Sequence, residues 1–180
     1  MLNDNKNENM IFKLILKISQ FRLKRNFNRK FKNLEKTLSL IHDANSFTLN
    51  NKLVYHNTIW NFAGFVNICS YDLAVAGYEM LFTNHHWKRV YFARQAALII
   101  FEASEDIPQL MGRKLRTAIS TLPNSQSLIA ELNQINANFT DYKREKRASL
   151  ERIRHFTIGH RDHDMEDVME IILNNLPPKN

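Results

Sequence analysis

The chain has 180 residues and a net charge of +7, and 44% of its residues are hydrophobic, an ordinary composition for one globular domain. Its four glycines, four prolines and single cysteine exclude a glycine-rich or disulfide-stapled fold and favour an all-α one, because helix interiors disfavour glycine and proline. Cys69 has no second cysteine to pair with and lies in an apolar stretch, so we expect a buried free thiol and a cytoplasmic protein.

The N-terminal part of the sequence is a polar start followed by a basic helix. Residues 1–9 are polar and are expected to be disordered. From residue 10 to about 41 apolar residues recur at spacings of three and four, which predicts an amphipathic helix, and we define residues 10–45 as the arm. Without the basic residues of the arm the chain is near neutral. The net positive charge therefore belongs to the arm and not to the helical domain expected over 46–180. The segment 11–34 contains no acid and eight basic residues: Lys13, Lys17, Arg22, Lys24, Arg25, Arg29, Lys30 and Lys32.

Two further helices are predicted in the middle of the chain. "DANSFTLNN" (43–51) breaks the helical pattern, and "KLVYH" (52–56) is interpreted as a short extended piece. An aromatic-rich helix is expected from Thr58 to about Leu81, and another, central in the core, from a cap at Asn84 to about Ser104.

The C-terminal part predicts three more helices, so the expected fold is a bundle of about six. One begins near Pro108, which suits a first helical turn. The next begins at Ser125 or Ser127 and runs to about Ile158, with Gly159 just past its end. Asp162 or Asp164 can cap a last helix that ends near Asn175. No run reaches the roughly 18 continuous apolar residues that a membrane-spanning helix needs.

The stretch "RIRHFTIGHRDHD" (152–164) holds three of the seven histidines and has three interpretations. In the first it is a structural helix end, where arginine and histidine favour the macrodipole. In the second, His160, His163 and Asp164 bind a metal ion, although the turn expected at Gly159 interrupts their common face. In the third, Arg154 binds a phosphate and His160 transfers protons during RNA cleavage, which needs no metal because the RNA 2′-hydroxyl is the nucleophile.

The run from Arg154 to His160 resembles the signature of the HEPN superfamily, an arginine followed after a few residues by a histidine. Here five residues intervene, and His155 takes the place of the polar residue that often follows the arginine. The continuation "IGHRDHD" is similar to the ending found in the phage-defence and toxin branches of that family. The resemblance covers the motif closely and residues 84–175 in architecture only.

The resemblance implies a HEPN-like all-α bundle with metal-independent endoribonuclease activity in a toxin or phage-defence setting. By this likeness Arg154 would bind the scissile phosphate, His160 would act as acid or base, and His155 would assist. The family also contains non-catalytic members, so the alternative is a module that binds nucleotide, RNA or an antitoxin protein. Family sites commonly form between two protomers, which implies a homodimer.

Three supporting roles complete the expected site. Arg94 and Glu102 on the third predicted helix, with Asp162 beyond the motif, are candidates to line the site behind the catalytic pair. An internal ion pair or a solvated helix edge is the slightly favoured explanation of Arg94 and Glu102. The basic residues of the arm are candidates to bind the RNA backbone. An anionic membrane surface is the less favoured partner for the arm, and no metal or cofactor is expected.

Overall fold

The computed structural model describes residues 4–154, with side chains from Leu14 to Arg152. The all-α prediction is confirmed for this part of the chain, whereas the sixth helix, expected to end near Asn175, lies outside the described residues. The described part has no strand and consists of five helices: α1 (Asp4–Asn50), α2 (Val54–Phe82), α3 (His86–Leu110), α4 (Arg113–Ile119) and α5 (Ser125–Arg154).

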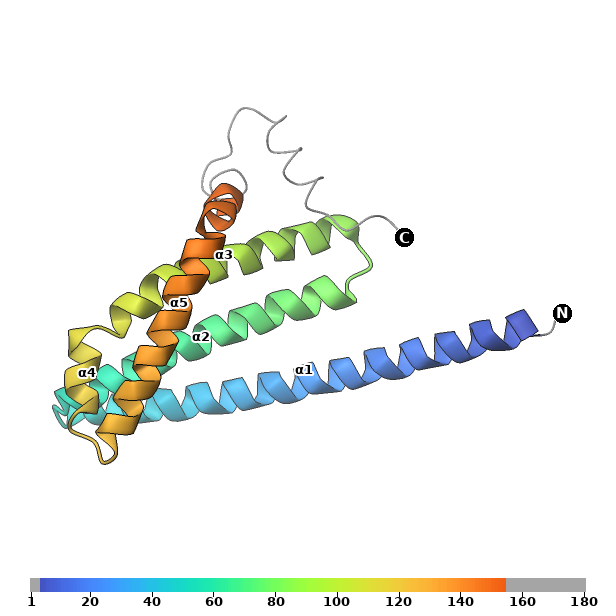
Figure 1. Cartoon of the computed structure of the whole chain (residues 1–180). Helices are drawn as coiled ribbons and strands as arrows, with labels where there is room; N and C mark the ends of the chain where they lie inside the picture. The colour runs from blue at the N-terminus through green and yellow to red at the C-terminus, as the bar shows by residue number, and fades with distance from the viewer. Residues whose placement is uncertain (1–3, 155–180) are drawn as a thin grey trace.

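The three long N-terminal helices lie next to one another in chain order, and α5 crosses the third of them (Figure 1). Helix α2 packs on α1 and α3, while α4 turns the chain at the end of α3 and contacts α2 and α5. The core lies where α2, α3, α4 and α5 meet, and it is partly covered by Phe62 and Phe65 of α2. Its buried members are Ala103, Ile107, Met111, Leu115, Ile119 and Leu132.

Helix α1 is longer at both ends than its apolar pattern predicts. It begins at Asp4, within the polar start that we expected to be disordered, and it continues through the predicted break to Asn50. The break prediction is wrong because polar side chains of this segment bond to α2 and do not terminate the helix. Asn57 of α2 donates hydrogen bonds to the side chains of Asn45 and Thr48, and Thr48 is buried.

The connection from α1 to α2 is therefore a tight turn, and the extended segment predicted at 52–56 is absent. Lys52 adopts a positive φ of 56°, and α2 begins at Val54. Thr58, the predicted cap, lies inside α2, where its hydroxyl donates to the carbonyl of Val54 at 3.0 Å. At the next connection α3 begins after His85, one residue beyond the predicted cap at Asn84.

The start of a new helix near Pro108 is a second wrong prediction. Pro108 lies in the last turn of α3, and the chain stays helical there because Ile107 and Met111 on either side of it are buried in the core. The helix ends at Leu110, and Gly112 follows in the turn before α4, where a Cβ atom would lie 2.8 Å from the carbonyl oxygen of Gln109. Only glycine fits this close approach, so Gly112 and not Pro108 separates α3 from α4.

The two halves of α1 differ in how they meet the rest of the molecule. The C-terminal half packs on α2 through a ring cluster that joins Phe27 and Phe31 to Tyr71, Tyr78 and Phe82. The N-terminal half extends past the connection between α2 and α3, and none of the other four described helices lies beside it there (Figure 1). No helix in the described part is both long and apolar enough to cross a membrane.

Candidate functional site at the contact of helices α3 and α5

The motif that carries the functional prediction lies at the C-terminal limit of the described residues. Arg154 is the last residue of α5, and its backbone is helical. His155, His160 and Asp162 lie outside the described residues. The same holds for His163 and Asp164, so the structure brings together neither the predicted catalytic pair nor the metal-ligand set.

Helix α5 presents a mixed apolar and charged face to α3. Leu132 and Leu150 are buried, whereas Ile135 and Tyr142, which belong to an apolar stripe along the helix, are 43% and 37% exposed. This stripe is interrupted because charged residues at spacings of four replace apolar ones in the second half of the helix. Lys143, Arg147 and Glu151 form this charged row beside Leu150.

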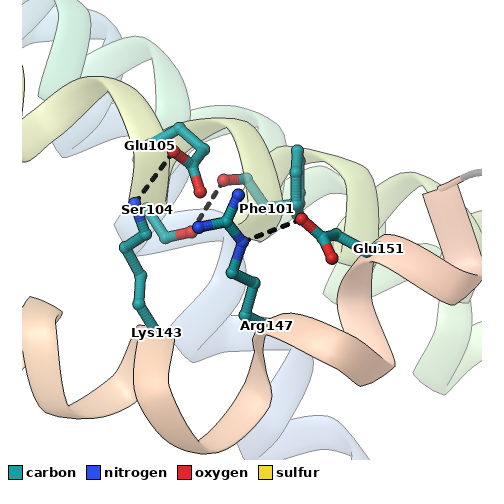
Figure 2. Close-up of polar contacts among 6 residues, drawn as sticks. All are labelled: Phe101, Ser104, Glu105, Lys143, Arg147 and Glu151. Carbon is teal, nitrogen blue, oxygen red and sulfur yellow. Dashed lines mark hydrogen bonds and ion pairs between the residues drawn. The ribbon is translucent and has the colours of Figure 1, made fainter.

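The charged row meets the carboxylates of α3 directly (Figure 2). The Nζ atom of Lys143 lies 2.8 Å from Oε2 of Glu105. The guanidinium of Arg147 bonds through Nε to Glu151, also at 2.8 Å, and this hydrogen bond raises the pKa of Arg147. Ser104 donates its hydroxyl to the carbonyl of Phe101 within the same group.

Glu105, Arg147 and Glu151 of this group also line a cavity of about 440 Å³ between α3 and α5. Its wall contains the guanidinium of Arg147, the ring of Phe101 and four carboxylates. The carboxylates are those of Glu102, Glu105, Asp106 and Glu151. The hydrogen bond from Lys143 lowers the pKa of Glu105, so this carboxylate is charged at neutral pH. The cavity is therefore negative and suits a cationic ligand better than a phosphate.

Arg154 continues the charged row of α5 beyond this cavity. It follows Arg147 by seven residues, which is two helical turns or about 10 Å along the same face of the helix.

The predicted supporting pair on α3 is not an ion pair. Arg94 and Glu102 are eight residues apart, which separates their backbones by about 12 Å along the helix. Glu102 lines the acidic cavity, whereas Arg94 does not. The Nε atom of Arg94 is buried with no hydrogen-bond partner in the described part, and burial lowers the pKa of this guanidinium.

The basic residues of the arm are accessible where their side chains are described. Seven of them, from Lys17 to Lys32, are exposed, and the side chain of Lys13 lies outside the described set. Within the described residues none of the seven forms an ion pair, although Lys24 lies over the ring of Phe82 at 5.1 Å. These cations are therefore free to bind an anionic partner.

Sequence reasoning missed most of the residues that line the acidic cavity. Lys143, Arg147 and Glu151 stand at intervals of four in the sequence, which is a detectable pattern of side chains on one helical face. Glu105, which pairs with Lys143, and Asp106, which lines the cavity, were missed because Pro108 suggested a helix start at this point, whereas α3 continues through it. Cys69, expected to be buried, is half-buried against the core, and burial raises the pKa of its thiol.

Comparisons with known proteins add no relative to this description. No protein-family model matches the chain, and neither the curated proteins nor the solved structures give a match.

Proposed function

We propose that the chain is a HEPN-like, metal-independent endoribonuclease whose reaction takes place at the C-terminal end of α5. A base removes the proton of the RNA 2′-hydroxyl, and the 2′-oxygen attacks the adjacent phosphorus. The bond from phosphorus to the 5′-oxygen breaks, and this oxygen leaves with a proton from an acid. Arg154 binds the phosphate, His160 transfers a proton, His155 assists, and a 2′,3′-cyclic phosphate remains.

One observation carries this proposal: Arg154 of the motif lies on a long helix, α5, that packs across an all-helical bundle. An arginine offers a phosphate a planar fork of hydrogen-bond donors. The exposed cations of the arm give further support, because the phosphates of RNA attract such residues without regard to sequence.

The second candidate is a HEPN-like module that binds a nucleotide, an RNA or an antitoxin protein without cleaving RNA, and the acidic cavity favours the antitoxin among these partners. Four carboxylates near Arg154 repel a polyanion, and they would suit a basic segment of a protein partner instead. Both candidates are compatible with a homodimer in which two copies of the motif share one site.

The experiment compares RNA cleavage by the wild type with that by His160→Ala and Arg154→Ala, all in the presence of EDTA. Losing a proton-transfer group typically lowers a rate by ~10²–10⁴-fold, which is the loss we expect for His160→Ala. Arg154→Ala should weaken both RNA binding and cleavage. The matched control is Arg152→Ala, which removes an exposed arginine two residues earlier on a different face of α5.

End-group analysis of the products should find a 2′,3′-cyclic phosphate. Cleavage that requires a divalent ion would favour the metal interpretation through His160, His163 and Asp164. If the wild type binds RNA or a nucleotide but cuts no RNA under any condition, the binding module becomes the better account.

A further inference from the structure

The free half of α1 exposes aliphatic side chains that RNA binding does not explain. Residues 4–23 precede the first contacts with α2 at Lys24 and Phe27, and they extend about 30 Å as a helix. Within this segment the aliphatic side chains of Leu14 and Ile18 are 58% and 44% exposed, and the aromatic ring of Phe21 is 68% exposed. Phosphates satisfy the lysines and arginines nearby, but aliphatic side chains neither pair with phosphate nor stack on bases.

These apolar residues form a row of their own on the helix. Leu14, Ile18 and Phe21 are separated by four and three residues, so they lie on one face. The face of α1 that packs on α2 is a different one. Phe27 lies on that face, and the residue two helical turns before it on the same face is Gln20, which is not part of the apolar row. Lys17 and Lys24 flank the apolar row. They are seven residues apart and therefore lie on the same side of the helix. Long basic side chains beside an apolar stripe suit a boundary between water and hydrocarbon.

A second group of the same character lies at the connection between α2 and α3. Leu81, Trp87 and Tyr91 are 55%, 50% and 52% exposed, and Lys88 and Arg89 between them are exposed as well. This connection is at the end of the bundle from which the arm extends, because the rings of Phe27 and Phe82 are in contact there (Figure 1). Tryptophan and tyrosine with neighbouring basic residues are typical of the interfacial layer of membranes.

The charge of this end of the bundle selects among partners. No acid occurs in residues 11–34 or in residues 80–101, whereas the two segments together contain eleven basic residues. A second copy of the same surface would bring like charges together, which opposes self-association through it. A partner must therefore be negative and apolar at once, and an anionic lipid bilayer offers phosphate groups above hydrocarbon.

We propose that the free half of α1 and the α2–α3 connection dock on the surface of an anionic lipid bilayer. The arm lies in the plane of the interface, with Leu14, Ile18 and Phe21 among the acyl chains and the lysines at the headgroups. Trp87 and Tyr91 form a second contact with the same bilayer. This inference does not depend on the ribonuclease proposal, because it uses neither Arg154 nor His160.

The test uses the full-length chain and sedimentation with vesicles of phosphatidylcholine, with or without phosphatidylglycerol. The protein should bind the anionic vesicles and not the neutral ones, and salt near 0.5 M should weaken binding because it screens the charges. Leu14→Ser together with Ile18→Ser should lower the affinity about tenfold or more, since two apolar contacts are lost. The matched control is Leu40→Ser with Leu49→Ser, which changes two residues of α1 that are 59% and 60% exposed but lie beyond the free half.

A second readout follows Trp87 in a Trp60→Phe background, where its fluorescence should shift to the blue on addition of anionic vesicles. Circular dichroism of each variant verifies that it remains folded. The proposal is overturned if anionic vesicles do not bind, or if the pair at 14 and 18 has no greater effect than its control. It is also overturned if this pair changes only RNA affinity, or only the sedimentation coefficient of a dimer, because the apolar row then serves RNA or a second copy.

Discussion

The two halves of α1 have similar sequences and opposite surroundings. Both are rich in apolar and basic residues and both are helical, but Ile41 in the C-terminal half is 7% exposed and Ile18 in the N-terminal half is 44% exposed. The difference comes from α2, which ends at Phe82 beside Phe27 and leaves the rest of α1 uncovered. An amphipathic pattern thus predicts that a face is apolar, but the length of the neighbouring helix decides whether the fold buries it.

The largest expected effect is a direct test of this difference. Ile41→Ala should lower the free energy of unfolding by about 2–5 kcal/mol, because it leaves a cavity against Gly64 of α2. Ile18→Ala removes the same atoms in the same helix, yet it should change the free energy by about 0.5 kcal/mol or less. Urea unfolding followed by circular dichroism measures both. Equal losses for the two variants would mean that the N-terminal half is packed in solution.

A smaller loss is expected at the polar contact between the packed half and α2. Asn67 is 7% exposed and donates its side-chain amide to the carbonyl of Leu34 at 3.0 Å. Asn67→Ala should lower the free energy of unfolding by about 1–2 kcal/mol, since a buried hydrogen bond is lost. Asn61→Ala, at an exposed position of α2, is the control, and it should have a clearly smaller effect in the same urea experiment.

The third change should stabilise the protein. Gly77 lies inside α2, and a Cβ atom there would meet the ring of Phe27 at 3.8 Å, which is ordinary contact. Gly77→Ala should therefore raise the free energy of unfolding by about 0.5–1 kcal/mol through helix propensity. The control is Gly112→Ala, which should destabilise because its Cβ would collide with the carbonyl of Gln109. A loss of stability at Gly77 would show that α1 and α2 pack more closely than these distances indicate.

The sequence predicted the helical class and the amphipathic arm because both follow from local composition and spacing. It did not predict that α1 continues through residues 43–50, because the amides and hydroxyls there bond to Asn57, which is a tertiary contact. The end of α3 was also predicted at the wrong place, because Pro108 suggests the start of a new helix. The break between the two helices lies at Gly112, where the close approach to the carbonyl of Gln109 requires glycine. At the candidate site, Arg154 lies on a long helix as expected, whereas the acidic cavity depends on two helices meeting and had no local pattern on the α3 side.

The smallest expected effect concerns the ionisation of Tyr71, whose hydroxyl donates to Oε1 of Glu35 on the packed half at 3.2 Å. This hydrogen bond raises the pKa of Tyr71 above its ordinary value of 10.0. A raised pKa in the folded state means that the bond contributes stability below pH 10 and that this contribution disappears as the pH rises through the folded value.

The phenolate absorbance of wild type minus that of Tyr71→Phe should therefore titrate above pH 10, and Glu35→Gln should move this difference to lower pH. Glu79→Gln, which removes a carboxylate from the helix that carries Tyr71, should leave the difference in place. If Glu35→Gln has no more effect than Glu79→Gln, the bond does not persist in solution, and α1 and α2 meet less closely at this point than at Phe27.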